Sequence, residues 1–241
     1  MRFRKAVLLV HGFAGGTYDE EFLANQLELN RILDVYAFTL PGHDSSVGVK
    51  ITKEAWIEKA ESVLEMLINN GYHHIYVIGH SMGGVIASHL ASKYPQVKKL
   101  VLAAPAFKCF ANKNGEFQIL DVVKAGPDII KTYTGAEVFS RFFKLPIKAV
   151  REFFALVSKY KDVPKKVKIP TLIIQGKEDQ VVPVESARYV YKNLDTSSKT
   201  LLLCKRVTHD IFKGERKEEI TERIEEFLIS KVSSKPEVIE I

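Results

Sequence analysis

Short runs of β-forming residues alternate with longer segments of helical periodicity along most of this chain. Because consecutive parallel strands need a crossover between them, usually a helix, this alternation is typical of a parallel sheet covered by helices on both faces. It predicts an α/β fold with a mostly parallel sheet, and 241 residues suffice for one such core. Six strands are expected, over residues 6–10, 35–40, 74–78, 100–104, 171–175 and 200–204.

Four helices are expected around these strands. Thr52 is a candidate N-cap of the first, Gly71 marks its end, and the others are expected over residues 83–94, 185–193 and 215–230. The first helix carries an apolar stripe at helical spacing, which indicates core packing: Trp56, Ala60, Val63, Leu64 and Leu67.

One long segment, residues 105–169, interrupts the alternation. It contains a helical stretch at residues 147–160, no convincing strand, and more phenylalanine than a simple connection needs. We interpret it as a small helical cap inserted into an α/β core formed by residues 1–104 and 170–231. Residues 232–241, which begin with a stretch rich in Ser and Lys, are expected to form a flexible tail.

Composition narrows the classes of partner. The net charge of +6 arises from 35 Lys and Arg residues interleaved with 29 Asp and Glu residues, which favours a solvated surface over a nucleic-acid site. The apolar stretch at residues 6–10 is short for a signal peptide and too short to span a bilayer. We therefore expect a cytoplasmic protein without stable membrane insertion or a nucleic-acid partner, and the sequence leaves the oligomeric state open.

The two cysteines, Cys109 and Cys204, provide neither a disulfide framework nor a zinc-ligand spacing. Cys204 lies inside an apolar run, where a buried and unreactive thiol is expected.

The strongest chemical motif is Gly79-His80-Ser81-Met82-Gly83, which matches G-x-S-x-G. In this motif a sharp strand-to-helix turn exposes the serine hydroxyl above the sheet, and the glycines remove Cβ atoms that would collide there. The pattern alone is also compatible with a glycine-rich turn that holds an incidental serine. A strand candidate directly before it and a small-residue helix directly after it favour Ser81 as a nucleophile.

A serine hydroxyl needs a base to accept its proton, and His209 is the best-placed histidine. It follows the last strand candidate after a short loop, which places it at the carboxyl edge of the sheet, where sites of parallel α/β folds form. The remaining candidates are expected to be structural or are less well placed: His11, His43, His73, His74 and His89.

The base in turn needs an acid to orient it, and Asp179 follows the strand candidate at residues 171–175 through a short loop. Glu178 is the nearest alternative. Asp210 adjoins His209 itself and is poorly placed to fold back onto that ring. A surface role for Asp179 is the competing interpretation.

The loop after the first strand, His11-Gly12-Phe13-Ala14-Gly15-Gly16, can provide an oxyanion hole. The main-chain N–H groups of Phe13 and Met82 are the expected donors to the negative charge that develops on a carbonyl oxygen. Its glycine spacing does not match a dinucleotide or P-loop fingerprint, so we expect no nucleotide, cofactor or metal.

Together these motifs resemble the α/β-hydrolase superfamily, and more narrowly the small bacterial carboxylesterases and monoacylglycerol lipases. The resemblance rests on an HGF-type oxyanion loop, the serine elbow, a late histidine, a PGHG-type turn (here Pro41-Gly42-His43-Asp44) and a G-x-x-D acid loop (here Gly176-Lys177-Glu178-Asp179). The order Ser81, Asp179, His209 is the order that these hydrolases use. Two departures are the absence of two further strands at the start and Thr208, where a glycine is common.

The resemblance implies a serine carboxylesterase that hydrolyses short- to medium-chain esters through an acyl-enzyme, with monoacylglycerols among the candidate substrates. A thioesterase or lipase with the same triad is the first alternative, and an amidase or C–C hydrolase also fits. Outside the enzymes, the chain could be a small-molecule receptor that retains the hydrolase fold.

Overall fold

The computed structural model describes residues 4–43, 50–108, 146–231 and 233–241. They form a seven-stranded sheet in which every neighbouring pair of strands is parallel, in the order β2-β1-β3-β4-β5-β6-β7. The strands are β1 (Lys5–Val10), β2 (Leu33–Phe38), β3 (Ile75–His80), β4 (Val97–Ala103), β5 (Thr171–Gly176), β6 (Lys199–Cys204) and β7 (Glu237–Glu240).

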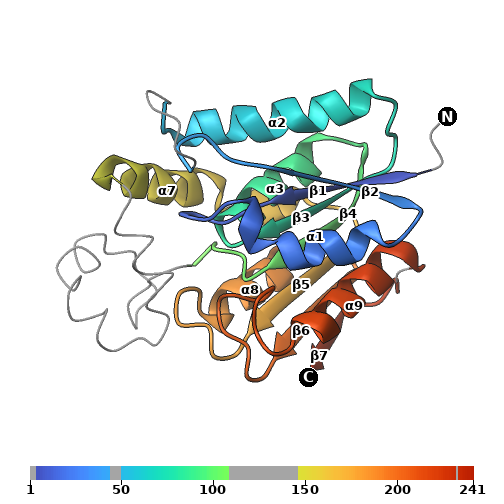
Figure 1. The fold of residues 1–241 in the computed structure, drawn as a ribbon. Helices are drawn as coiled ribbons and strands as arrows, with labels where there is room; N and C mark the ends of the chain where they lie inside the picture. The colour runs from blue at the N-terminus through green and yellow to red at the C-terminus, as the bar shows by residue number, and fades with distance from the viewer. Residues whose placement is uncertain (1–3, 44–49, 109–145, 232) are drawn as a thin grey trace.

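Helices cover both faces of this sheet (Figure 1). One face packs against α2 (Lys53–Asn69), α3 (Met82–Lys93), α7 (Ile147–Tyr160) and α8 (Val184–Asn193), and the other against α1 (Glu21–Glu28) and α9 (Lys217–Ile229). Successive strand residues alternate between these two cores: in β1, Leu8 belongs to the first and Leu9 to the second. Short 3-10 turns occur at Thr17–Asp19 (η1) and Val163–Lys166 (η2).

The expected α/β-hydrolase class and all six expected strands are confirmed, but the strand count is wrong because β7 adds a seventh. The flexible tail expected over residues 232–241 is also wrong for its last part, since β7 pairs in parallel with β6 and Ile241 N donates to Leu203 O at 3.0 Å. The β7 side chains are mostly exposed, so main-chain hydrogen bonds rather than an apolar pattern hold this strand.

Local sequence signals define the ends of α2 as expected. The Thr52 hydroxyl accepts a hydrogen bond from Ala55 N at 3.2 Å, which satisfies one of the free N–H groups of the first turn. The chain leaves the helix through Gly71, whose φ of +86° lies in the left-handed region that favours glycine. Helix α1 was not expected, because it buries only Leu23 and Leu27 and so carries a weak apolar stripe.

The described part of the expected cap consists of α7, η2 and the residues that flank them. The helix expected at residues 147–160 is confirmed, and it packs against α2 and α3 (Figure 1). The rest of the cap, residues 109–145 with Cys109, lies outside the described residues, as does Asp44. The division into core and cap therefore stays a prediction.

Cys204 is fully buried in β6, and burial raises the pKa of its thiol to about 12. The expectation of an unreactive thiol is consistent with that environment. No helix in the described ranges is long and apolar enough to cross a membrane.

Candidate active site

Ser81 occupies the sharp turn between β3 and α3. Its φ of 54° is in the left-handed region, which is uncommon for a residue with a side chain and marks a strained position. Main-chain hydrogen bonds hold the turn: Ser81 N donates to Ala103 O at 2.9 Å, and Ser81 O accepts from Gly84 N and Ala106 N. The serine thus lies at the carboxyl edge of the two central strands β3 and β4, as the motif predicts.

The glycines of the elbow are required by close main-chain approaches. A Cβ atom on Gly83 would lie 1.9 Å from Val10 O, and one on Gly79 would lie 2.3 Å from Gly83 O. Because both obstacles are main-chain atoms, they cannot rotate out of the way. The elbow therefore depends on the absence of side chains at these two positions.

We expect Gly83→Ala to lower the free energy of unfolding by about 3 kcal/mol, since α3 would have to move away from β1. Thermal and urea unfolding would measure the loss. Gly214→Ala is the matched control, because the nearest atom to its added Cβ, Asp210 O, lies 3.7 Å away in ordinary contact. Equal stability of the two variants would contradict the close packing of the elbow.

The structure brings Asp179 and His209 together at the same edge. Asp179 lies in the loop after β5 and His209 in the loop after β6, and His209 Nδ1 lies 2.8 Å from Asp179 Oδ2. The side chains are 0% and 8% exposed, so water competes little for this contact. A carboxylate can only accept here, so Nδ1 carries the proton and the Nε2 lone pair is left as the basic atom.

The Asp179 carboxylate is held as an anion by its surroundings. Oδ1 accepts from the main-chain N–H groups of Val181 and Val182, at 2.8 and 2.9 Å, and Oδ2 also accepts from Gln175 Nε2 at 3.0 Å. Burial opposes the charge, but the charge of His209 and these hydrogen bonds outweigh it and lower the pKa of Asp179. The carboxylate is therefore stabilised in its ionised form, which can accept the hydrogen bond from His209 Nδ1.

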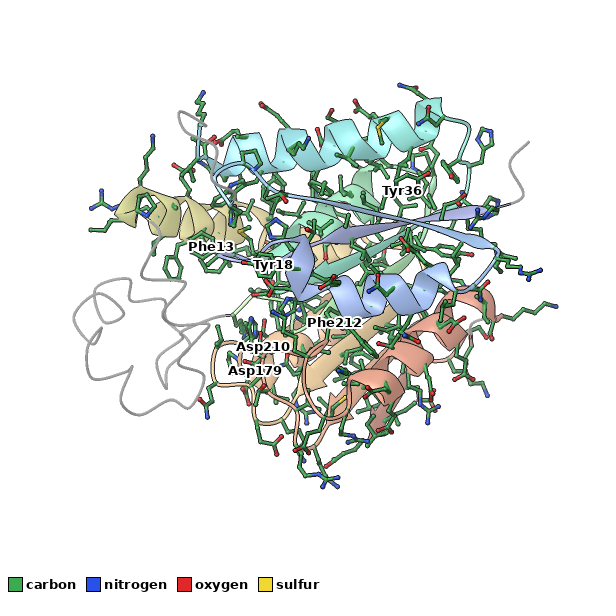
Figure 2. All side chains as sticks on the ribbon, viewed as in Figure 1. Phe13, Tyr18, Tyr36, Asp179, Asp210 and Phe212 are labelled. Carbon is green, nitrogen blue, oxygen red and sulfur yellow. The ribbon has the colours of Figure 1, made fainter. Side chains whose placement is uncertain are left out.

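The two alternative acids have other environments. Glu178 Oε2 accepts from Val207 N at 2.9 Å, so this side chain braces the loop that carries His209. Asp210 lines the pocket beside His209, and Figure 2 shows it near Asp179 in the loops below the sheet edge. The ring of His209 bonds to Asp179 rather than to either of them.

The glycine-rich loop after β1 lies against the same site. Gly12, Phe13, Ala14 and Gly15 line a small pocket of about 30 Å³ with Ser81, His209 and Asp210. The Phe13 ring is stacked on Phe153 of α7, at 5.0 Å between centroids, and Figure 2 shows it beside that helix. The loop therefore connects the nucleophile to the described part of the cap.

The His11 ring holds this loop in place through two hydrogen bonds to the main chain. Its Nε2 accepts from Leu40 N at 2.9 Å, so its Nδ1 carries the proton and donates to Gly12 O at 2.7 Å. Burial, followed by the charge of His43, lowers the pKa of His11 to about 4. His11 is therefore a neutral structural histidine, a role that its place next to Gly12 in the sequence does not reveal.

The other histidines lie outside the acid–base contact. His43 Nδ1 lies 3.3 Å from Pro41 O, and His89 Nε2 lies 2.8 Å from Glu61 Oε1 on α2. His73 and His74 are exposed before β3, at the opposite end of that strand from Ser81.

Sequence reasoning missed three residues around the site: Gln175, Glu20 and His80. Gln175 reaches Asp179 from the preceding strand, and a polar residue at the end of an apolar strand was the available signal. His80 lies inside the elbow motif, but its partners come from distant segments. Within the ranges that the structure describes, no group of three or more His, Cys, Asp or Glu side chains is arranged to hold a metal ion.

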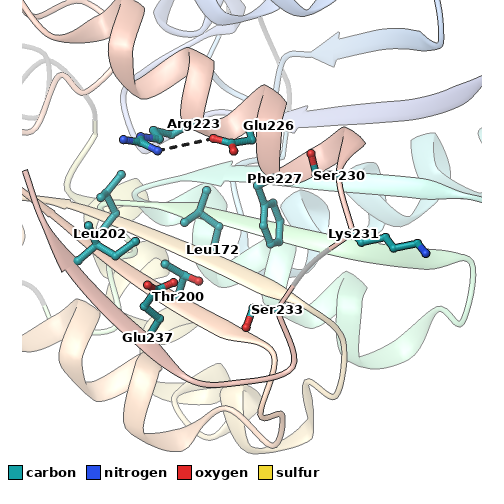
Figure 3. Close-up of a pocket in the computed structure, with 11 residues that line it drawn as sticks. Leu172, Thr200, Leu202, Arg223, Glu226, Phe227, Ser230, Lys231, Ser233 and Glu237 are labelled. Carbon is teal, nitrogen blue, oxygen red and sulfur yellow. Dashed lines mark ion pairs between the residues drawn. The ribbon is translucent and has the colours of Figure 1, made fainter.

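Among the described residues, larger cavities lie outside this pocket, and two of them lie against helices α7 and α9. One, of about 480 Å³, is lined by α7 and Phe107 and is mostly apolar, with Arg151 and Lys161 among its residues. The other, of about 260 Å³, lies between α9 and strands β5 to β7, and an ion pair of 3.6 Å between Arg223 and Glu226 lies at its margin (Figure 3). Phe107, which lines the first, directly follows Ala106, whose N–H donates to Ser81 O at 3.1 Å.

Comparison with known proteins identifies the families and relatives that this chain resembles. The sequence model of the alpha/beta hydrolase fold family matches residues 5–126, and the model of the serine aminopeptidase family matches residues 118–217. A carboxylesterase of Bacillus subtilis is 26% identical over 93% of this chain and 92% of its own length. A monoacylglycerol lipase of Mycolicibacterium smegmatis is 22% identical over 94% and 89%. The solved structure of a monoacylglycerol lipase from Paleococcus ferrophilus superposes with a TM-score of 0.71 at 24% identity, over 92% of this chain and 93% of that one.

Proposed function

Because this chain belongs to the alpha/beta hydrolase family, we propose that it is a serine carboxylesterase with Ser81 as nucleophile, His209 as base and Asp179 as orienting acid. The observation that carries the proposal is the buried His209–Asp179 hydrogen bond of 2.8 Å, which leaves Nε2 as the basic atom in the pocket that Ser81 lines. The carboxylesterase and monoacylglycerol lipase relatives support an ester as the substrate.

The reaction has two acyl-transfer steps. His209 Nε2 takes the hydroxyl proton as Ser81 Oγ forms a bond to the ester carbonyl carbon, and the carbonyl electron pair moves to oxygen. The N–H groups of Phe13 and Met82 stabilise that oxyanion; removing one such donor typically costs about 3 kcal/mol. The tetrahedral carbon then releases the alcohol, which takes its proton from His209, and water attacks the acyl-enzyme by the same route.

A short- to medium-chain acyl group fits the described surroundings best. The 480 Å³ cavity along α7 presents Phe107, Phe154 and Val157, which suit an alkyl chain. Two cations at the same cavity, Arg151 and Lys161, favour a second candidate, a thioesterase for an acyl group carried on an anionic thiol. Both candidates use the same triad, so the geometry of the site does not separate them, and the relative turnover of ester and thioester substrates is needed.

A panel of p-nitrophenyl esters from acetate to palmitate tests the proposal. We expect kcat/KM to be greatest for butyrate to octanoate and at least about tenfold lower for palmitate, because an apolar cavity of about 480 Å³ has room for an acyl chain of limited length. An acyl thioester with a nucleotide-bearing thiol is the comparison substrate, and faster turnover of it would favour the thioesterase. A fluorophosphonate identifies the receptor alternative, since a pocket without an activated serine does not form the covalent adduct.

A further inference from the structure

His80, the residue directly before Ser81, is buried behind the site and contacts the main chain of His209. Its Nε2 lies 3.0 Å from His209 O, and because a carbonyl oxygen only accepts, Nε2 carries a proton. The two rings lie 5.0 Å apart between centroids. His80 thus connects the elbow to the loop that holds the base.

The other nitrogen of His80 faces Glu20. Nδ1 lies 3.5 Å from Glu20 Oε1, and the side chains are 8% and 3% exposed. Glu20 comes at the start of α1, immediately after the turn η1 that follows the glycine-rich loop. A carboxylate buried to this degree needs a partner with a proton to offer, and His80 is the partner that the structure provides.

We propose that Glu20 and His80 are positioning residues for His209: Glu20 holds His80 in its doubly protonated form, and the Nε2–H of His80 holds the main chain of His209 in place. The inference rests on the proposed function of the same site and adds two residues that do not touch the substrate. It predicts that the pair affects turnover through His209 rather than through substrate binding.

The charges around His80 support its protonated form. Burial alone would lower the pKa of His80, but the Glu20 carboxylate at 3.5 Å raises it, with smaller contributions from the His209 carbonyl and Asp210. Burial also raises the pKa of Glu20, and the contact with His80 opposes that shift. Lys213, the nearby cation, is paired with Asp19, and His11 is neutral at its low pKa. Three acidic groups face His80: Glu20 from the start of α1, Asp19 from η1 and Asp210 from the loop after β6. The other ionisable groups around it are Lys213 and His209 from the same loop and His11, which directly follows β1.

A second contact ties the same segment to both catalytic loops. Asp19 Oδ2 accepts from Gly16 N at 3.2 Å, and Asp19 Oδ1 pairs with Lys213, four residues after His209. Residues 19 and 20 thus contact the glycine-rich loop, the elbow and the loop of the base. Their location fits a role in fixing the relative positions of the glycine-rich loop, the elbow and the loop that carries His209.

Kinetics of Glu20→Gln and Glu20→Leu test the proposal. Gln can still donate a hydrogen bond to Nδ1 of a neutral His80, whereas Leu leaves Nδ1 without a hydrogen-bonding group opposite it. We expect kcat to fall about tenfold in Glu20→Gln and about a hundredfold in Glu20→Leu, with KM within about twofold, because a small misplacement of a catalytic group is costly. Loss of the His80 cation beside His209 should also move the acidic midpoint of the kcat/KM profile in Glu20→Gln to higher pH, by about half a unit.

Glu61→Gln is the matched control. It alters a His–Glu contact of the same kind, His89 with Glu61 at 2.8 Å, farther along α3, and we expect unchanged kcat and pH profile. Unchanged kcat and pH profile in both folded Glu20 variants would overturn the proposal. Circular dichroism would measure the folded fraction of each variant. A fall in kcat that is fully explained by a smaller folded fraction would also overturn the proposal.

Nuclear magnetic resonance of ¹⁵N-histidine-labelled protein tests the pair without any substrate. The unaltered chain should show His80 with both nitrogens protonated at neutral pH, and Glu20→Leu should abolish that state. A singly protonated His80 in the unaltered chain would overturn the proposal. Absence of ester turnover and of serine labelling in the unaltered chain would instead refute the proposed function, so the two failures are distinguishable.

Discussion

Ser81→Ala is expected to reduce hydrolysis of p-nitrophenyl butyrate by about 10⁶-fold in kcat, because the nucleophile that carries the acyl group is lost. The fold should persist. Ser81 makes no side-chain cap hydrogen bond at the start of α3, so removing its hydroxyl leaves no helix donor without its partner. Steady-state kinetics would measure the loss and thermal unfolding would confirm that the variant is folded.

The matched control is Ser88→Ala, a second buried serine on the same helix. Its hydroxyl donates to Gly84 O at 2.8 Å within α3, so the substitution should cost only about 1 kcal/mol of stability and leave kcat unchanged. Substantial esterase turnover by folded Ser81→Ala would remove Ser81 as the nucleophile.

Asp179→Asn is expected to lower kcat by about 10⁴-fold, with little change in structure. The amide can still accept from the Val181 and Val182 N–H groups through its oxygen, but its NH₂ group then faces His209 Nδ1. A donor in that position favours the tautomer with the proton on Nε2, which cannot act as a base toward Ser81. The rate of fluorophosphonate labelling should fall with kcat, since both depend on the activated hydroxyl.

Glu178→Gln is the comparison variant, because Glu178 is the adjacent carboxylate and braces Val207 N instead of the ring of His209. We expect its kcat to stay within a few-fold of the unaltered chain. The opposite result, an active Asp179→Asn and an inactive Glu178→Gln, would assign the orienting acid to Glu178.

The sequence was most informative where chemistry depends on local structure or on the ends of parallel strands. The elbow around Ser81 is a local motif, and its strand, turn and helix follow one another in the chain. Asp179 and His209 each follow a strand, and because parallel strands end at one edge, two loops distant in sequence meet there. This geometry allowed their contact to be predicted without any long-range information.

What the sequence did not reveal depends on contacts between distant segments. Glu20 and His80 look unrelated in the chain, and only the fold brings them together, by placing the N-cap of α1 beside His80. The four residues of β7 are mostly exposed, so they lack the apolar alternation that identifies the other strands. Gln175 is a polar residue near the end of an apolar strand, which is a signal of a special role, but the sequence does not show that its amide supports Asp179.

The seventh strand also affects how copies of this protein meet one another. A sheet edge presents unpaired N–H and C=O groups that can recruit a strand from another molecule, and proteins discourage this with short, charged edge strands. β7 has only four residues and carries Glu237 and Glu240, the latter paired with Lys177 and Lys205. Because β7 pairs with the longer and more apolar β6, this edge of the sheet is a short strand with two glutamates, the type of edge that discourages pairing with a strand of another molecule.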